Sequence, residues 1–128
     1  MVERGRGRVV IIASVAGWRG LPRAAAYGPT KAALISLATS LRFDLEPKGI
    51  TVQVISPGFV DTEATAVNDF TMPQLMTIDA AAAEIIAGMQ TSRFEISFPR
   101  RFALTMRLIS LLPWSLYFRL VGMRTGAK

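Results

Sequence analysis

The sequence predicts an α/β fold in which about three parallel strands form a partial, doubly wound sheet with covering helices. Residues 8–13 and 50–55 are continuous apolar runs of strand length, the pattern of parallel strands buried on both faces. The segment between them has the length and composition of one long helix, which fits the crossover that joins two parallel strands. Amphipathic helices are expected at the C-terminal end of the chain.

Composition limits the chemistry that this fold can carry. Of the 128 residues, 51% are hydrophobic and 19% are charged, which is typical of a folded domain. The sequence contains neither Cys nor His, so disulfides and the common zinc sites are excluded, and acid–base roles fall to Tyr, Lys or carboxylates. The net charge of +6 comes mostly from scattered arginines without interleaved aromatic residues, so we expect no nucleic-acid partner. No metal site is expected. The N-terminus lacks a signal-peptide pattern, which favours a cytoplasmic location.

The first strand stops at Ser14. In an open α/β sheet the carboxyl ends of the strands form the ligand-binding edge, so we expect the Ser14 hydroxyl at that edge. An ordinary strand-end serine is the alternative interpretation, because Ser is common in turns.

The next helix is expected over residues 25–45, because Pro29 is tolerated only in a first helical turn. Tyr27 and Lys31 then lie one turn apart on the same face. A tyrosine has an ordinary pKa of about 10, and a nearby lysine cation lowers that pKa toward neutrality. A phenol, an ammonium and a serine hydroxyl that can hydrogen-bond a substrate oxygen suit the interconversion of a carbonyl and an alcohol.

Ser14, Tyr27 and Lys31 at this spacing resemble the active-site segment of the short-chain dehydrogenase/reductase family. Residues 7–17 are similar too, although Ala13 stands where many members have Ser. The resemblance implies a Rossmann-like fold, NAD or NADP as the cofactor, and hydride transfer to or from a small carbonyl or alcohol substrate, with a lipophilic one left open. It implies catalytic roles for Ser14, Tyr27 and Lys31, with Tyr27 as the acid and base.

A second apolar strand, residues 50–56, is followed by Pro57 and Gly58. Residues 55–62 resemble the cofactor-side motif of the same family. The resemblance implies that the backbone around residues 57–60 lines the nicotinamide and that Thr62 reaches its carboxamide or phosphate. The implied cofactor-binding residues are Tyr27, Lys31, Pro57, Gly58, Phe59, Val60 and Thr62.

Beyond this motif, the resemblance implies a mobile lid over the substrate at residues 63–76. Thr77 is expected to cap a helix over residues 80–90. Residues 94–98 alternate in polarity and end at a proline, so they predict a third strand at an edge of the sheet.

Residues 102–123 have about the length of a membrane span, but two arginines and Pro113 interrupt them. Two amphipathic helices, over residues 103–112 and 114–122, fit better. A flap over the substrate pocket, a subunit contact, and an anchor at a membrane surface all remain open for them.

The resemblance implies that residues 1–99 are the C-terminal half of an NAD(P)-binding Rossmann-like domain and that residues 100–128 are an amphipathic helical extension. The Gly-rich phosphate-binding turn of such a domain is not found in this sequence. Two hypotheses stay open: an oxidoreductase that forms a homo-oligomer through the helix with Tyr27 and Lys31, or a catalytically inert remnant or interaction module with peripheral membrane contact.

Overall fold

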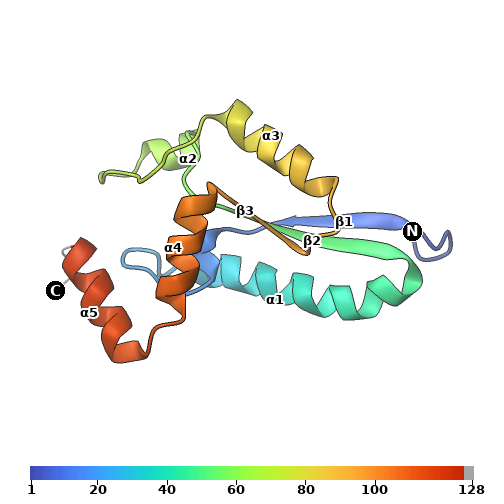
Figure 1. The fold of residues 1–128 in the computed structure, drawn as a ribbon, viewed down its shortest axis with the longest axis horizontal. Helices are drawn as coiled ribbons and strands as arrows, with labels where there is room; N and C mark the ends of the chain where they lie inside the picture. The colour runs from blue at the N-terminus through green and yellow to red at the C-terminus, as the bar shows by residue number, and fades with distance from the viewer. Residues whose placement is uncertain (126–128) are drawn as a thin grey trace.

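The structure is a computed structural model that describes residues 1–125 (Figure 1). The predicted extension over residues 100–128 therefore has its last three residues outside the described range. In chain order the elements are β1 (Gly7–Ile12), η1 (Val15–Gly17), α1 (Tyr27–Leu45), η2 (Glu46–Lys48), β2 (Ile50–Pro57), α2 (Glu63–Ala66), α3 (Ile78–Met89), β3 (Glu95–Phe98), α4 (Arg100–Ser110) and α5 (Trp114–Thr125).

The strands form one parallel sheet in the order β1-β2-β3. Ile12 of β1 lies opposite Ile55 of β2, and Pro57 of β2 lies opposite Phe98 of β3. All three strands therefore end at the same edge of the sheet, and β3 is an edge strand as predicted. β1 is the other edge strand of this sheet.

Helices cover both faces of the sheet, with α1 on one side and α3 on the other (Figure 1). Because side chains alternate along a strand, successive residues of β2 reach opposite faces, and each face builds its own hydrophobic core. The core on the α1 side contains Ala13, Ala38, Val52 and Val54, and the core on the α3 side contains Ile55, Ala81, Ile96 and Phe98. The predicted doubly wound α/β arrangement is confirmed.

α1 begins at Tyr27, slightly later than predicted, and carries Pro29 in its first turn. The missing N–H of proline breaks no helical bond there. The helix ends at Leu45 as predicted, and η2 leads to Gly49, whose φ of 74° is in the left-handed region that favours glycine.

Gln53 interrupts the apolar pattern of β2, and its side chain is fully buried. Its amide nitrogen donates to the carbonyl oxygens of Thr91 at 3.1 Å and Arg93 at 2.9 Å. A buried amide is stabilised when such bonds replace its bonds to water. Gln53 therefore hydrogen-bonds β2 to the turn between α3 and β3. The apolar pattern of the strand did not indicate this buried polar contact.

The segment predicted as a lid contains the short helix α2, and a parallel bridge joins Val60 to Met76. Its mobility stays a prediction. Thr77 caps α3 as expected, since its side-chain oxygen accepts from the Ala80 N–H at 3.3 Å.

The two predicted C-terminal helices are present as α4 and α5. α4 begins at Arg100, three residues earlier than predicted, and Pro113 separates it from α5. Across residues 1–125, no helix is both long and apolar enough to cross a membrane.

Candidate active site

Ser14 lies at the edge of the sheet where β1 ends. The pairing of β1 with β2 extends to Ala13, whose N–H donates to the Ile55 carbonyl at 2.7 Å. Ser14 then caps η1: its hydroxyl oxygen accepts from the Ala16 N–H at 3.1 Å. The same hydroxyl donates to the Pro57 carbonyl at 3.4 Å. The side chain of Ser14 therefore bridges the ends of the first two strands, and only 7% of the residue is exposed.

Lys31 reaches the same strand end from the first turn of α1. Its Nζ donates to the Ile12 carbonyl at 3.3 Å, two residues before Ser14. The same ammonium lies 5.5 Å from the centroid of the Tyr27 ring, within the range of a cation–π interaction. The structure therefore brings Lys31 beside Tyr27 and beside the strand end that carries Ser14.

Tyr27 is the first residue of α1 and is 51% exposed. Its carbonyl accepts from the Thr30 hydroxyl at 2.7 Å, which stabilises the first turn. Within residues 1–125 its phenolic hydroxyl makes no hydrogen bond, including none to Ser14. The phenol is therefore available to a group that enters from solvent, at the edge of the sheet where ligands bind in open α/β folds.

Gly17 allows η1 to pack directly on α1. A Cβ at this position would lie 2.7 Å from the Lys31 carbonyl carbon and 2.8 Å from the Ala32 nitrogen. Real side chains essentially never come so close to backbone atoms, so only glycine permits this contact. Gly17 thus sets the distance between the loop that follows Ser14 and the helical turn that carries Lys31.

The second predicted site segment, residues 57–62, leaves the same edge of the sheet. The Gly58 N–H donates to the Phe98 carbonyl at 2.7 Å, so the backbone stays paired with β3 just past the end of β2. The Phe59 carbonyl accepts from the Met76 N–H at 3.0 Å. These bonds hold residues 57–60 in one place at the strand ends.

Thr62 is the N-cap of α2. Its N–H donates to the Thr65 hydroxyl oxygen at 2.9 Å, and that hydroxyl donates to the Val60 carbonyl at 2.6 Å. The bonds between Thr65 and residues 60–62 order the start of α2. The structure places Thr62 close in sequence to the strand end, and its role toward a cofactor stays a prediction.

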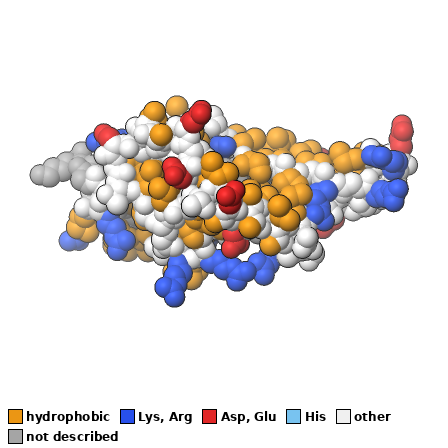
Figure 2. Space-filling view, turned by 90° about the horizontal axis from the view of Figure 1, so that it is seen from above, with side chains coloured by type: hydrophobic (Ala, Val, Ile, Leu, Met, Phe, Trp, Pro, Cys, Tyr) orange, Lys and Arg blue, Asp and Glu red, His pale blue; other side chains and the backbone are white. Residues whose placement is uncertain are grey.

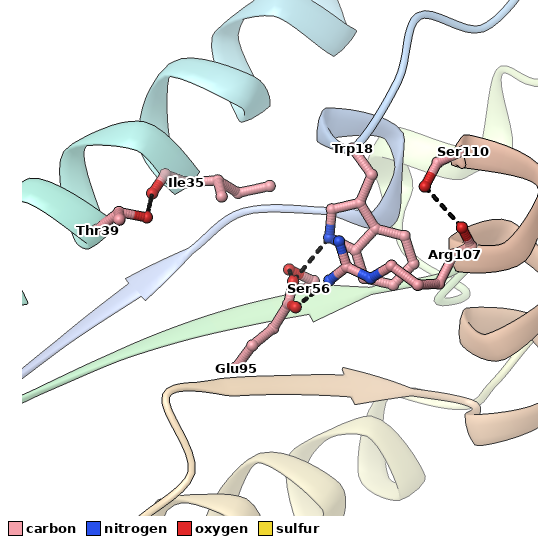
Figure 3. A network of polar contacts seen from close by, with 7 residues as sticks. All are labelled: Trp18, Ile35, Thr39, Ser56, Glu95, Arg107 and Ser110. Atoms are coloured by element: carbon pink, nitrogen blue, oxygen red, sulfur yellow. Dashed lines mark hydrogen bonds and ion pairs between the residues drawn. The ribbon is translucent and has the colours of Figure 1, made fainter. Parts of the chain in front are cut away.

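A polar network that the sequence did not indicate surrounds Glu95, the first residue of β3 (Figure 3). The Glu95 carboxylate accepts from the Trp18 indole N–H at 2.7 Å and from the Ser56 hydroxyl at 2.9 Å. It also forms an ion pair with Arg107, whose guanidinium carbon lies 3.8 Å from the centroid of the Trp18 ring. Trp18 belongs to the loop between Ser14 and Tyr27, so this network ties that loop to β3 and α4.

A cavity of about 570 Å³ lies beside the same network, between α3, β3 and α4. Trp18, Arg93, Glu95 and Arg107 are among the residues that line it. Its lining contains none of the three predicted catalytic residues. Glu95 and Arg107 in its lining pair with one another. We therefore place the candidate site at the strand ends around Ser14, where the three predicted residues lie, instead. Among residues 1–125, no cluster of acidic side chains could hold a metal ion.

The chain is similar to proteins of one enzyme family. Residues 1–71 match the family model of the short chain dehydrogenases. A protein of Myxococcus xanthus, described as an uncharacterized oxidoreductase, is 44% identical over 117 residues, which are 91% of this chain and 46% of that protein. MabA of Mycobacterium avium, a 3-oxoacyl-(acyl-carrier-protein) reductase, is 39% identical over 69 residues, which are 54% of this chain and 27% of that protein.

Among solved structures, a short-chain dehydrogenase from Sphingobium yanoikuyae in complex with NADPH superposes with a TM-score of 0.69 and 30% sequence identity. The superposition covers 89% of this chain and 49% of that one. The chain thus spans about half the length of the Myxococcus and Sphingobium proteins. Because the family model matches more than half of its residues and the parallel sheet is that of the family, the chain belongs to the short-chain dehydrogenase family.

Proposed function

We propose that this chain carries the proton-transfer half of an NAD(P)-dependent oxidoreductase that interconverts a carbonyl and an alcohol. Ser14, Tyr27 and Lys31 are its catalytic residues. The observation that carries the proposal is the position of the Lys31 ammonium, which contacts the end of β1 and lies beside the Tyr27 ring. A cation is thereby held next to a phenol at the ligand-binding edge of the sheet.

Each of the three residues has one role. Tyr27 gives a proton to the substrate oxygen during reduction and removes it during oxidation. The positive charge of Lys31 stabilises the negative charge that develops on the Tyr27 oxygen as the proton leaves it. Ser14 turns its one hydroxyl proton from the Pro57 carbonyl, 3.4 Å away in this structure, to the same substrate oxygen and stabilises the charge that develops on it.

The donors at this edge suit a nicotinamide ribose. The Lys31 ammonium has three N–H groups and uses one of them on the Ile12 carbonyl, which leaves two for ribose hydroxyls. The cofactor-binding residues of the proposal are Tyr27, Lys31, Pro57, Gly58, Phe59, Val60 and Thr62. When bound, NAD or NADP supplies or accepts the hydride.

Residues 1–99 then correspond to the half of the domain that holds the nicotinamide, and residues 100–128 to a helical extension. This sequence has no Gly-rich turn to hold the cofactor's diphosphate. The coverage of about half in the Myxococcus and Sphingobium proteins supports this division. We therefore expect tight binding of NADPH only when the other half of the domain is supplied.

A chimera tests the proposal directly. The part of the Myxococcus xanthus relative that this chain matches is replaced by this chain, and the chimera is titrated with NADPH and assayed with ketones that include a 3-oxoacyl thioester. The match to a 3-oxoacyl reductase supports that choice of substrate. Saturable NADPH binding with turnover is the expected result. A folded chimera that binds NADPH but reduces none of the ketones would favour the inert interaction module.

A homo-oligomer is proposed through the exposed face of α1, the helix that carries Tyr27 and Lys31. The side chains of Leu37 and Phe43 are exposed on this helix, and Phe43 is 78% exposed. Large apolar side chains left exposed on one helix are what a second copy of the chain would cover.

Phe43→Asp is expected to dissociate the proposed homo-oligomer of the chimera, because burying an unpaired carboxylate in the interface is unfavourable. Sedimentation velocity measures the change. Val67→Asp, at a more exposed apolar residue outside α1, serves as the control and should leave the homo-oligomer intact. Equal sedimentation of the two variants would contradict an interface on α1.

Peripheral contact with an anionic membrane is proposed for α4 and α5. The net charge of the chain arises in residues 100–128, which contain six Lys or Arg and no Asp or Glu, whereas the earlier basic residues are matched in number by acidic ones. α4, α5 and the turn between them expose large apolar side chains, as expected of an interfacial segment. These are Leu104, Leu108, Leu111, Trp114, Leu116, Phe118 and Met123.

Lipid binding is expected to depend on where the charge lies. Figure 2 shows one face on which Lys and Arg lie mostly toward the edges, with hydrophobic side chains and several Asp and Glu between them, so charge of both signs is unevenly distributed over the surface. We compare the double variant Arg119→Ser/Arg124→Ser with Arg4→Ser/Arg6→Ser, which removes the same charge from the opposite end of the molecule (Figure 1).

In sedimentation with phosphatidylserine vesicles, the first pair should weaken binding roughly 30-fold, at about 1 kcal/mol per arginine, and the second should change it little. An equal effect of both pairs, or no binding by the unmodified chain, would exclude a membrane contact through α5.

A further inference from the structure

Three consecutive residues of the loop between Ser14 and Tyr27 contact the C-terminal part of the chain. Trp18 binds Glu95 of β3 and stacks on Arg107 of α4 (Figure 3). Arg19 and Gly20 bind the end of α4 and α5. The hydrogen bonds of Arg19 and Gly20 thus hold the loop between Ser14 and Tyr27 against segments that are 91 to 97 residues away in the sequence.

Arg19 makes most of these contacts. Its Nη1 donates to the carbonyl oxygens of Ser110 at 2.6 Å and Leu112 at 2.5 Å. The last carbonyls of a helix lack helical partners and carry the negative end of the helix dipole, so a cation is favourable there. The guanidinium also lies between two rings, 3.9 Å from the centroid of Trp114 and 4.1 Å from that of Tyr117.

Tyr117 completes the connection. It is 2% exposed, and its hydroxyl donates to the Gly20 carbonyl at 2.5 Å. Burial raises the pKa of Tyr117 above its ordinary value, an effect that the nearby Arg19 charge opposes. The phenol therefore stays protonated at neutral pH and keeps donating to the loop.

We propose that Arg19 is a positioning residue of the active site: by binding the carbonyl end of α4 between the rings of Trp114 and Tyr117, it fixes the loop that sets Ser14 relative to Tyr27. This inference rests on the proposed function. Within residues 1–125, the hydrogen bonds and cation–π contacts of Arg19 go to the end of α4 and to α5 and not to the residues proposed to bind the cofactor. Its loss therefore affects the alignment of the proton-transfer groups and leaves cofactor binding largely unchanged.

Arg23 in the same loop provides a matched control. It forms an ion pair with Asp69 at 3.1 Å, and both side chains are more than three-quarters exposed. Exposed pairs of this kind contribute little to stability. Arg19→Ala and Arg23→Ala remove the same side chain from the same loop, but only the first releases it from α4 and α5.

The experiment compares these two variants in the chimera with the Myxococcus xanthus relative. We expect Arg19→Ala to lower kcat about 10- to 100-fold, the scale of a small misalignment of reacting groups, with little change in the KM for NADPH. Amide exchange across residues 15–26, followed by mass spectrometry, should become faster. Arg23→Ala should change neither quantity, and Arg19→Lys should recover part of kcat because lysine can still donate to one of the two carbonyls.

Tyr117→Phe keeps the ring and removes only the hydroxyl, so it can be measured even if Arg19→Ala does not fold. Amide hydrogen exchange at residues 18–20 should become faster in this variant, because the hydrogen bond to the Gly20 carbonyl is lost. Unchanged exchange in Arg19→Ala, or unchanged kcat despite faster exchange, would overturn the positioning role and leave the proposed function standing. A folded chimera that binds NADPH and is inactive before any substitution would overturn both.

Discussion

Replacing Tyr27 with Phe is expected to reduce turnover of the chimera by about 10²- to 10⁴-fold, the usual contribution of a general acid or base. The substitution removes the only group that the proposal gives for protonating the substrate oxygen. It keeps the ring that lies 5.5 Å from the Lys31 ammonium, so the first turn of α1 should not change. The rate of NADPH oxidation in the presence of a ketone measures the effect.

NADPH titration and thermal unfolding of the same variant are the controls. Thermal unfolding should match the unmodified chimera, because Tyr27 is about half exposed and its hydroxyl makes no hydrogen bond within residues 1–125. NADPH should still bind, at most about 10-fold more weakly, the scale of one lost hydrogen bond, because Lys31 and residues 57–62 keep the other proposed cofactor contacts. Turnover that stays within a few-fold of the unmodified rate would rule out Tyr27 as the acid and base. The site would then need another proton donor.

Gly17→Ala is expected to destabilise the fold by overpacking the contact between η1 and α1. The added Cβ would lie 2.7–2.9 Å from backbone atoms of Lys31 and Ala32. Backbone atoms of a packed helix cannot rotate away as a side chain can, so η1 and α1 must separate. We expect a loss of about 1–3 kcal/mol in the free energy of unfolding, the typical cost of overpacking. Urea denaturation followed by circular dichroism measures it.

Gly20→Ala is the matched control, because a Cβ at Gly20 would meet nothing within 4 Å. It should be neutral or stabilise by about 0.4–1 kcal/mol through a smaller entropy of the unfolded chain. If the two alanine variants unfold at the same urea concentration, η1 does not pack on α1 as described. If Gly17→Ala lowers the stability but the chimera with this substitution keeps its turnover, the contact between η1 and α1 stabilises the fold without positioning the catalytic residues.

The order and type of the main elements followed from local patterns. Two apolar runs indicated parallel strands, and Pro29 placed the start of α1 to within two residues because proline fits only a first turn. The boundaries of α4 and α5 were less accurate, by as many as three residues. Helix ends depend on the carbonyl and amide partners supplied by neighbouring segments, which periodicity does not report.

Within the candidate site, the sequence indicated Ser14, Tyr27 and Lys31 because all three lie within one strand–loop–helix unit. It gave no sign of Gln53 as a buried polar residue, whose partners are 38 and 40 residues away. It also missed Trp18, because a single tryptophan in a loop has no periodic signal and its partner Glu95 is 77 residues distant.

The sequence by itself determined the fold class, the family, and a chemistry without thiol or imidazole groups, because these depend on composition and on spacing within about twenty residues. Only the tertiary structure decided that the loop carrying Trp18 and Arg19 is held by β3, α4 and α5. Those contacts form only when segments distant in sequence pack together. They depend on where the Glu95 carboxylate, the Ser110 carbonyl and the Tyr117 ring lie in three dimensions, which local sequence patterns do not report.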